Sequence, residues 1–298
     1  MKRAILRTSD WSRGDVEEVL ELARVLKDER RRGVSRDSLR GKHVALYLEK
    51  PSVRTRVSFT VATRELGGDV VELTGHTTKV GHGEHPFDFA AVLARYCHAI
   101  VARVFADEAL RSIADGAAAI PVVNALSDEH HPCQSLADAL TLKERFGDAK
   151  GLTVAYVGDG RTNVVHSLVE MGALLGFEVR VACPPGFEPD PAIHGRPTIV
   201  RDAREAVRGA DAVYTDTWVS MGKEEETDER RRALSPYKLD RALFDLASPR
   251  AIVLHCLPAV RDEEIDAELL HDARSAVLDQ AENRLHTEKA LLSILLAP

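Results

Sequence analysis

The chain has 298 residues, of which 44% are hydrophobic and 29% charged, and its formal net charge is −7. This length suits two domains of ordinary size, and the composition is that of a globular protein. The negative charge argues against a general nucleic-acid-binding protein, and no apolar run approaches the roughly 20 residues of a membrane span.

The first half of the chain alternates between short apolar runs and helical periodicity. Residues 8–32 begin with capping residues and continue with apolar positions at helical spacing, which predicts an amphipathic helix. From Gly41 onward we expect strands at 43–48, 69–73, 99–105 and 120–126, and helices at 53–68, 86–97 and 110–117.

The second half repeats this rhythm after a polar loop at 127–135 and a helix at 136–147. Further strands are expected at 152–159, 178–183, 211–216 and 251–258, with helices at 163–176, 202–210 and 280–297. The charged run KEEETDERRR, 223–232, is predicted to be a mobile loop.

Strands that alternate with helices predict α/β domains, in which helices cover both faces of a parallel sheet. We expect two Rossmann-like domains joined by interdomain helices. The first domain would span 1–132, closed by the C-terminal helix 281–298, and the second would span 150–280. An interdomain helix at 133–149 would connect them.

The four cysteines, Cys97, Cys133, Cys183 and Cys256, are far apart and form no CxxC pair, as is usual for reduced thiols. The segment MKRAILRTSDWSRGD lacks the apolar stretch of a signal peptide. We therefore expect a cytoplasmic protein that binds neither a membrane nor nucleic acid.

The segment PSVRTR connects a predicted strand to a predicted helix and is rich in groups that bind anions. Ser52, Val53, Arg54 and Thr55 would form the helix N-terminus, where unpaired backbone N–H groups and the helix dipole favour an anion. Arg54 could add a bidentate phosphate contact. Taken alone, the segment is better explained by a capped helix with surface arginines. It is not a P-loop, since it lacks the glycines and the GK[ST] ending.

The segment HHPCQ opens the helix near the predicted domain boundary. His131 and Gln134 are about one helical turn apart, so both could face one cleft and hold a carbonyl oxygen and an amide nitrogen. A structural role for the histidine is the alternative. His130 and Cys133 beside His131 also suggest zinc, but no second pair of ligands follows at a recognisable spacing, so no metal is expected.

Three later segments follow predicted strands, and side chains in such positions gather at the carboxyl edge of a parallel sheet. GDGRTN is only a weak dinucleotide signal, and Asn163 could instead hold a carboxylate or amide at a helix start. In DTWVSMG, Asp216 would suit an ammonium group. In HCLP, Cys256 taken alone is better explained as an inert buried thiol, the usual state of a free cysteine.

Single arginines stand in otherwise apolar or helical settings at Arg103 and Arg284. An unpaired buried charge is costly, so each requires a partner. An anion shared with Arg54 would supply one.

Together these segments, in this order from about Leu39 to Leu292, resemble the aspartate/ornithine carbamoyltransferase family. PSVRTR and HPCQ resemble its carbamoyl phosphate site, whereas DTWVSMG and HCLP resemble the ornithine-specific loops. The resemblance implies that the enzyme transfers the carbamoyl group of carbamoyl phosphate to the side-chain amine of L-ornithine, without a cofactor, as a homotrimer in arginine metabolism. Residues 1–132 would bind carbamoyl phosphate and residues 150–280 ornithine.

The resemblance also implies roles for individual residues. Those expected to bind carbamoyl phosphate are Ser52, Val53, Arg54, Thr55, Arg103, His131, Gln134, Leu257 and Arg284. Those expected to bind ornithine are Asn163, Asp216, Ser220, Met221 and Cys256. Arg103, His131, Cys256 and Asp216 would be catalytic. Independently of the resemblance, Arg56 lies nearly a full turn round the helix from Arg54, so we expect it to support the site by structural pairing.

Two features depart from the family pattern. Val53 replaces a threonine, which removes a hydroxyl but keeps a backbone N–H. Lys79 and His82 lie near a position where ornithine enzymes present a residue to the neighbouring subunit, and Lys79 is a candidate for that role.

The chemistry requires donors for the negative charge that develops on the carbonyl oxygen, and Thr55, Arg103 and His131 are the candidates. Two alternatives remain. One is a carbamoyltransferase for another amine, such as putrescine or an acylated ornithine. The other is a non-catalytic nucleotide- or phosphate-binding protein, which would have no need of Asp216 or Cys256.

Overall fold

The computed structural model describes residues 1–296 apart from 76–77, 79, 81–82 and 220–226. The chain divides into two compact units. Unit 1 comprises Met1–Leu140 and Glu282–Pro298, and unit 2 comprises Thr141–Ala281. No helix within the described ranges is both long and apolar enough to cross a membrane.

Unit 1 is built around a five-stranded sheet in the order β1-β5-β4-β2-β3, in which every neighbouring pair is parallel. Its strands are β1 (Ala4–Ile5), β2 (His43–Leu48), β3 (Asp69–Thr74), β4 (Ala99–Arg103) and β5 (Val122–Leu126). Its helices are α1 (Arg13–Arg31), α2 (Val53–Glu65), α3 (Pro86–Tyr96) and α4 (Asp107–Gly116), with a 3₁₀ turn at Thr8–Asp10. Helices α5 (Pro132–Phe146) and α10 (Val277–Leu296) each contain a boundary between the two units.

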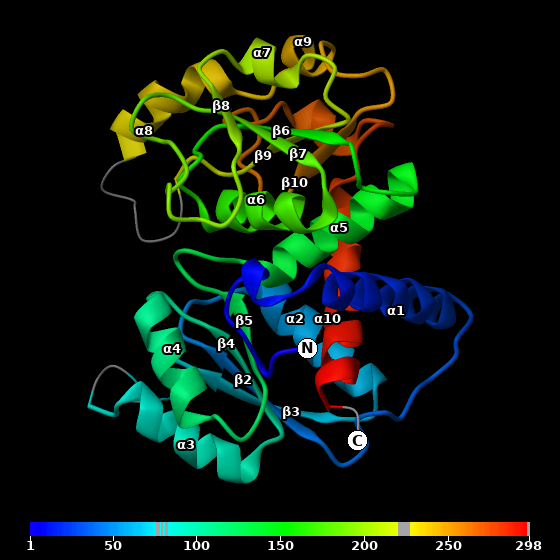
Figure 1. The fold of residues 1–298 in the computed structure, drawn as a ribbon, viewed down its shortest axis with the longest axis vertical. Coiled ribbons are helices and arrows are strands. Elements are labelled where there is room, and N and C mark those ends of the chain that lie inside the picture. Colours follow the sequence, from blue (N-terminus) through cyan, green and yellow to red (C-terminus); the bar gives the residue numbers. More distant parts are fainter. Residues whose placement is uncertain (76–77, 79, 81–82, 220–226, 297–298) are drawn as a thin grey trace. The chain divides into compact units, whose positions relative to one another are not determined.

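Both faces of the unit 1 sheet are covered, which explains why its central strands are continuously apolar. Tyr47 of β2 packs with Phe89 of α3 and Leu110 of α4 in one hydrophobic cluster. The alternating neighbours of Tyr47, Leu46 and Leu48, are also buried and therefore point to the opposite face. Figure 1 shows α3 and α4 on one side of this sheet and α2 and α10 on the other.

Unit 2 has a second parallel five-stranded sheet, in the order β10-β9-β6-β7-β8. Its strands are β6 (Thr153–Val157), β7 (Glu178–Ala182), β8 (Thr198–Val200), β9 (Ala212–Thr215) and β10 (Ile252–His255). Its helices are α6 (Asn163–Leu175), α7 (Ala203–Val207), α8 (Thr227–Leu234) and α9 (Arg241–Phe244), with 3₁₀ turns at Ser235–Tyr237 and Ala267–His271.

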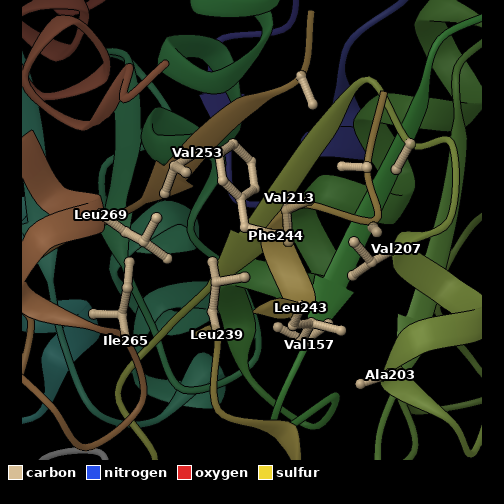
Figure 2. Close-up of a cluster of buried hydrophobic side chains, with 14 of the residues drawn as sticks. Val157, Ala203, Val207, Val213, Leu239, Leu243, Phe244, Val253, Ile265 and Leu269 are labelled. Carbon is tan, nitrogen blue, oxygen red and sulfur yellow. The ribbon is translucent and has the colours of Figure 1, made fainter. Parts of the chain in front are cut away.

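The core of unit 2 lies between its sheet and the short helices α7 and α9. Figure 2 shows Phe244 of α9 among Val213 of β9, Val253 of β10 and Leu239, all of which belong to one buried cluster. Helix α6 covers the opposite face of the sheet (Figure 1). Thr162 caps α6 by accepting a hydrogen bond from the Val165 N–H, so the helix begins immediately after the strand β6 and its loop.

The two parallel sheets flanked by helices confirm the predicted fold class. The prediction of a mobile loop at 223–232 was wrong for its second part, because Thr227–Leu234 form α8. This helix is held by the buried Arg230, whose guanidinium pairs with Asp159. Residues 223–226 lie outside the described residues. The strands β1 and β8 were not predicted, because two or three residues carry too little periodicity to be recognised.

Candidate active site

In unit 1 the carboxyl ends of adjacent parallel strands bring the predicted anion-binding residues to one edge of the sheet. Residues 52–55 follow β2, Arg103 is the last residue of β4, and His131 follows β5. The register pairs Leu48 of β2 with Arg103 of β4. Since parallel strands share the direction of their ends, these segments converge although they are far apart in sequence.

The N-terminus of α2 has the geometry of an anion-binding helix start. Ser52 is the N-cap in extended conformation, and its Oγ accepts a hydrogen bond from the Thr55 N–H at 3.3 Å. The Val53 side chain is exposed. Valine has no hydroxyl to offer an anion here, but the backbone N–H of Val53 still lies in the first turn of the helix. The positive end of the helix dipole adds to the attraction for an anion.

Arg284 of α10 joins this edge from the far end of the sequence. Its Nη1 donates to Nε2 of His131 at 3.0 Å and to Oε1 of Gln134 at 3.2 Å. The amide nitrogen of Gln134 donates to Asp138 at 2.8 Å, which fixes the orientation of the Gln134 side chain. All four side chains are almost completely buried.

The electrostatics of this cluster determine the charge of His131. Burial lowers the pKa of His131 well below its usual value, and the nearby guanidinium groups of Arg284, Arg103 and Arg54 lower it further. The imidazole is therefore neutral at physiological pH. Because a guanidinium only donates, Nε2 of His131 is the acceptor and its proton is on Nδ1.

The two arginines of the PSVRTR segment have different environments. The positive charge of Arg54 lowers the pKa of His131, as do those of Arg103 and Arg284. Arg56 instead forms an ion pair with Glu72 of β3, with Nε and Oε2 2.8 Å apart at the protein surface. Arg56 thus has the ion-pair partner that was predicted, whereas its support of the site stays a prediction. Of these two arginines, only Arg54 is among the charges that lower the pKa of His131.

In unit 2 the predicted residues Asn163, Asp216 and Cys256 follow β6, β9 and β10, which are adjacent in the sheet. The Cys256 thiol donates to Oδ1 of Asp216 at 3.0 Å, and the same oxygen accepts the Thr217 N–H at 2.7 Å. Asp216 is nearly buried, while Cys256 is partly exposed. The interpretation of Cys256 as an inert core thiol is therefore wrong, because its sulfur lies beside a carboxylate at the sheet edge.

A buried pair that was not predicted holds the HCLP loop in place. Nδ1 of His255 accepts the Leu257 N–H at 2.9 Å, so Nε2 carries the proton and donates to Oε1 of Glu264 at 3.1 Å. The same Glu264 oxygen accepts the Val260 N–H at 2.7 Å. Leu257 adopts a φ of 59°, a left-handed conformation that needs such support in a residue other than glycine.

Arg230 of α8 is a second stabilising residue that sequence reasoning missed. Its guanidinium pairs with Asp159 in the loop that precedes α6, and its Nε donates to the Trp218 carbonyl at 2.8 Å in the loop after β9. It therefore connects the two loops that carry Asn163 and Asp216. Its sequence neighbours are charged, so only its burial in the folded unit distinguishes it from a surface arginine.

The geometry of Cys133 and His131 does not agree with the zinc alternative, whereas His130 lies with Asp107 and Glu129 in one group of potential ligand atoms. The Cys133 thiol is fully buried and donates to the Asn124 carbonyl at 3.3 Å, and burial raises its pKa far above the usual value. Nε2 of His131 already accepts a hydrogen bond from the Arg284 guanidinium. The triad Asp216, His255 and Cys256 also has three potential ligand atoms close together, but both ring nitrogens of His255 are already engaged. Ser220, Met221, Lys79 and His82 lie outside the described residues.

These features define a two-unit α/β protein with a cationic site at the sheet edge of one unit and a carboxylate–thiol site at the sheet edge of the other. Comparison with protein families gives a more specific result. The model of the carbamoyl-P binding domain of aspartate/ornithine carbamoyltransferases matches residues 3–144, and that of the Asp/Orn binding domain matches residues 150–295. The chain belongs to this family. In the structure, however, residues 282–296 pack with the first unit rather than the second.

Individual relatives are similar over nearly their full lengths. The ornithine carbamoyltransferase of Symbiobacterium thermophilum is 45% identical, with 99% of this chain and 98% of the relative covered. The crystal structure of ornithine carbamoyltransferase from Thermus thermophilus has a TM-score of 0.92 at 44% identity and covers 99% of both chains. The enzyme from Pyrococcus furiosus has a TM-score of 0.93 at 41% identity, covering 98% of this chain and 96% of its own.

Proposed function

We propose that the protein transfers the carbamoyl group of carbamoyl phosphate to the side-chain amine of L-ornithine, giving L-citrulline and phosphate. The observation that carries this proposal is the neutral His131 among Arg54, Arg103 and Arg284. Cations that surround a neutral donor suit a ligand with both an anionic phosphate and a polarisable carbonyl group. Family membership and the names of the relatives support the same activity.

In unit 1, residues 1–140 with α10, carbamoyl phosphate would be held by the start of α2. The backbone N–H groups of residues 53–55 and the Arg54 guanidinium would bind the phosphate. Arg103, the Thr55 hydroxyl and the Nδ1–H of His131 would donate to the carbonyl oxygen, on which negative charge develops during attack. The second lone pair of Gln134 Oε1 would accept the carbamoyl N–H, since its first is used by Arg284.

In unit 2, residues 141–281, Asp216 and Asn163 would bind the α-amino and α-carboxylate groups of ornithine. Cys256 and Leu257 would lie beside its side-chain amine. This amine must be neutral to attack, whereas a lysine-like ammonium has a reference pKa near 10.4, so a dry site that disfavours the charge would assist. As the new C–N bond forms and the bond from carbon to the phosphate oxygen breaks, the departing phosphate would take the proton from nitrogen. No cofactor and no metal are needed for this step.

The acceptor specificity is tested by citrulline-type product formation from carbamoyl phosphate with L-ornithine, N-acetylornithine or putrescine. We expect turnover with L-ornithine and rates at least about 100-fold lower with the other two, because they lack the charged α-amino group or the carboxylate that unit 2 would bind. Turnover with one of the other amines but not with ornithine would refute the acceptor while leaving carbamoyl transfer intact.

We further propose that the enzyme is a cytoplasmic homotrimer in which Lys79 is presented to a neighbouring subunit. The family resemblance supports this assembly. The monomer mass is 32.7 kDa, so light scattering after size exclusion distinguishes a trimer from a monomer or dimer. Subunit complementation between an Arg54→Ala and a Lys79→Ala variant would recover activity only if sites are shared between subunits.

A further inference from the structure

Glu288 of α10 is a completely buried carboxyl group that the proposed mechanism does not use. It stands one helical turn after Arg284, and its Oε1 accepts from Nε of Arg284 at 3.3 Å and from Nη2 at 3.0 Å. The two side chains are 1% and 5% exposed. Glu288 therefore orients the guanidinium whose other nitrogen, Nη1, reaches His131 and Gln134.

The surroundings of Glu288 make its ionised form costly. Among the described residues its second oxygen, Oε2, has no hydrogen-bond partner. The groups that face it are the Arg284 guanidinium on α10, the Cys133 thiol on α5 and the Ser58 hydroxyl on α2. Burial raises the pKa of Glu288 to about 7, although the charge of Arg284 and the nearby Ser58 hydroxyl both lower it. The Ser58 hydroxyl makes no well-formed hydrogen bond to Oε2.

We propose that Glu288 is a positioning residue for Arg284 whose proton determines how tightly the site binds a phosphoryl anion. This inference rests on the proposed function, because it concerns the same carbamoyl phosphate site. When Glu288 is protonated, Oε1 still accepts from Arg284, so the guanidinium keeps its place and its full positive charge acts on the ligand. When Glu288 is ionised, its negative charge offsets part of the positive charge of Arg284, so the site attracts an anion less strongly.

Proton uptake by Glu288 would then accompany binding of the anion. An anion near Arg284 further disfavours the carboxylate, so the bound state holds the proton to a higher pH than the free state. By linkage, the affinity of the wild type falls by up to about tenfold for each pH unit above about pH 7, until the bound state also loses the proton. A glutamine at this position accepts from Arg284 in the same way but cannot ionise.

The test measures dissociation constants by calorimetry between pH 6 and pH 9 for the wild type, Glu288→Gln and Glu288→Ala. The ligands are carbamoyl phosphate and phosphonoacetamide, a stable analogue with a methylene in place of the bridging oxygen. We expect the wild type and E288Q to agree within about threefold at pH 6 and E288Q to bind at least tenfold more tightly at pH 8.5. Glu288→Ala also loses the extra pH dependence, but it binds more weakly at every pH because Arg284 is no longer held.

Ionisation of the ligand itself cancels in these comparisons, because the same ligand meets every variant. Glu282→Gln serves as a control, since it removes one negative charge from the same helix at a site that faces Lys27 instead. It should keep the wild-type pH profile. Parallel pH profiles for the wild type and both Glu288 variants would overturn the role of Glu288 while leaving the proposed function intact. Failure of the wild type to bind either ligand would overturn the proposed function and this inference together.

Discussion

The pH dependence of the stability of the ligand-free protein gives an independent measure of the raised pKa of the buried Glu288. Substitution by glutamine removes the ionisable proton and keeps an acceptor for Arg284. Burial raises the pKa of Glu288 to about 7 in the folded protein, from the ordinary glutamate value of about 4.5. A group whose pKa is raised on folding stabilises the fold fully at pH below about 4.5, and this contribution is lost as the pH rises to about 7.

The size of the effect follows from these two values. Each pH unit between them corresponds to about 1.4 kcal/mol, so ionisation of Glu288 lowers the free energy of unfolding by roughly 3 kcal/mol at pH 8. E288Q does not incur this loss. We therefore expect it to be more stable than the wild type by up to about 3 kcal/mol at pH 8, which corresponds to a melting temperature about 5 °C higher for a chain of this length. The difference should disappear near pH 5.

The assay is scanning calorimetry in phosphate-free buffers from pH 5 to pH 8.5. Glu282→Gln provides a control of opposite sign on the same helix. Burial alone would raise the pKa of Glu282, but the hydrogen bond from His286 and the charge of Lys27 outweigh it, so the pKa is lowered. Glu282 therefore stabilises the fold above its unfolded pKa, and E282Q should melt below the wild type at pH 8. A stability difference between E288Q and the wild type that does not change with pH would refute the reasoning.

Three further predictions concern the two sites and the core. Arg54→Ala should abolish the rise in melting temperature that carbamoyl phosphate gives the wild type. Arg56→Ala breaks only a surface pair with Glu72, so it should keep that rise and change the free energy of unfolding by less than about 1 kcal/mol. Equal effects of the two variants would contradict the separate roles of these arginines. Asp216→Asn should lower kcat/KM for ornithine about 100-fold in steady-state assays and keep the rise in melting temperature that carbamoyl phosphate gives. If that rise were lost as well, Asp216 would not act on the acceptor alone. Phe244→Ala should lower the free energy of unfolding by about 3–5 kcal/mol in urea denaturation, and a loss below about 1 kcal/mol would exclude its place in the packed core.

Much of the fold could be predicted because the parallel strands leave a strong local pattern. HVALYL, TVAYV and IVLH are buried on both faces, so they appear in the sequence as unbroken apolar runs. The loops after these strands then had to lie at the carboxyl edge, which placed the candidate residues on the correct side of each sheet. The helix α8 was missed because TDERRRAL carries charges on most positions and only Arg230 among them is buried beside Asp159.

The supporting residues of the sites could not be predicted, because their roles arise from contacts between distant segments. Glu288 in the segment HTEKA has the sequence context of an exposed helical glutamate. It is buried because α10 packs beside Cys133 of α5 and Ser58 of α2. Glu264 likewise lies in a charged stretch, and only the folded loop reveals its bond to His255. Local composition therefore indicated candidate ligand-binding residues, but it did not indicate the residues that hold them in place.

The packing of α10 with unit 1 has a consequence for biosynthesis. The ribosome makes residues 141–281 before it makes Glu282, so unit 2 can fold as a continuous segment while unit 1 still lacks its last helix. Until then His131 and Gln134 lack the hydrogen bonds from Arg284, and Cys133 lacks Glu288 beside it. A fragment that ends at residue 144, where the family model of the first domain ends, would share this defect permanently. Expression of the first domain alone therefore requires residues 282–296 to be supplied, either by fusion after residue 140 or as a separate peptide.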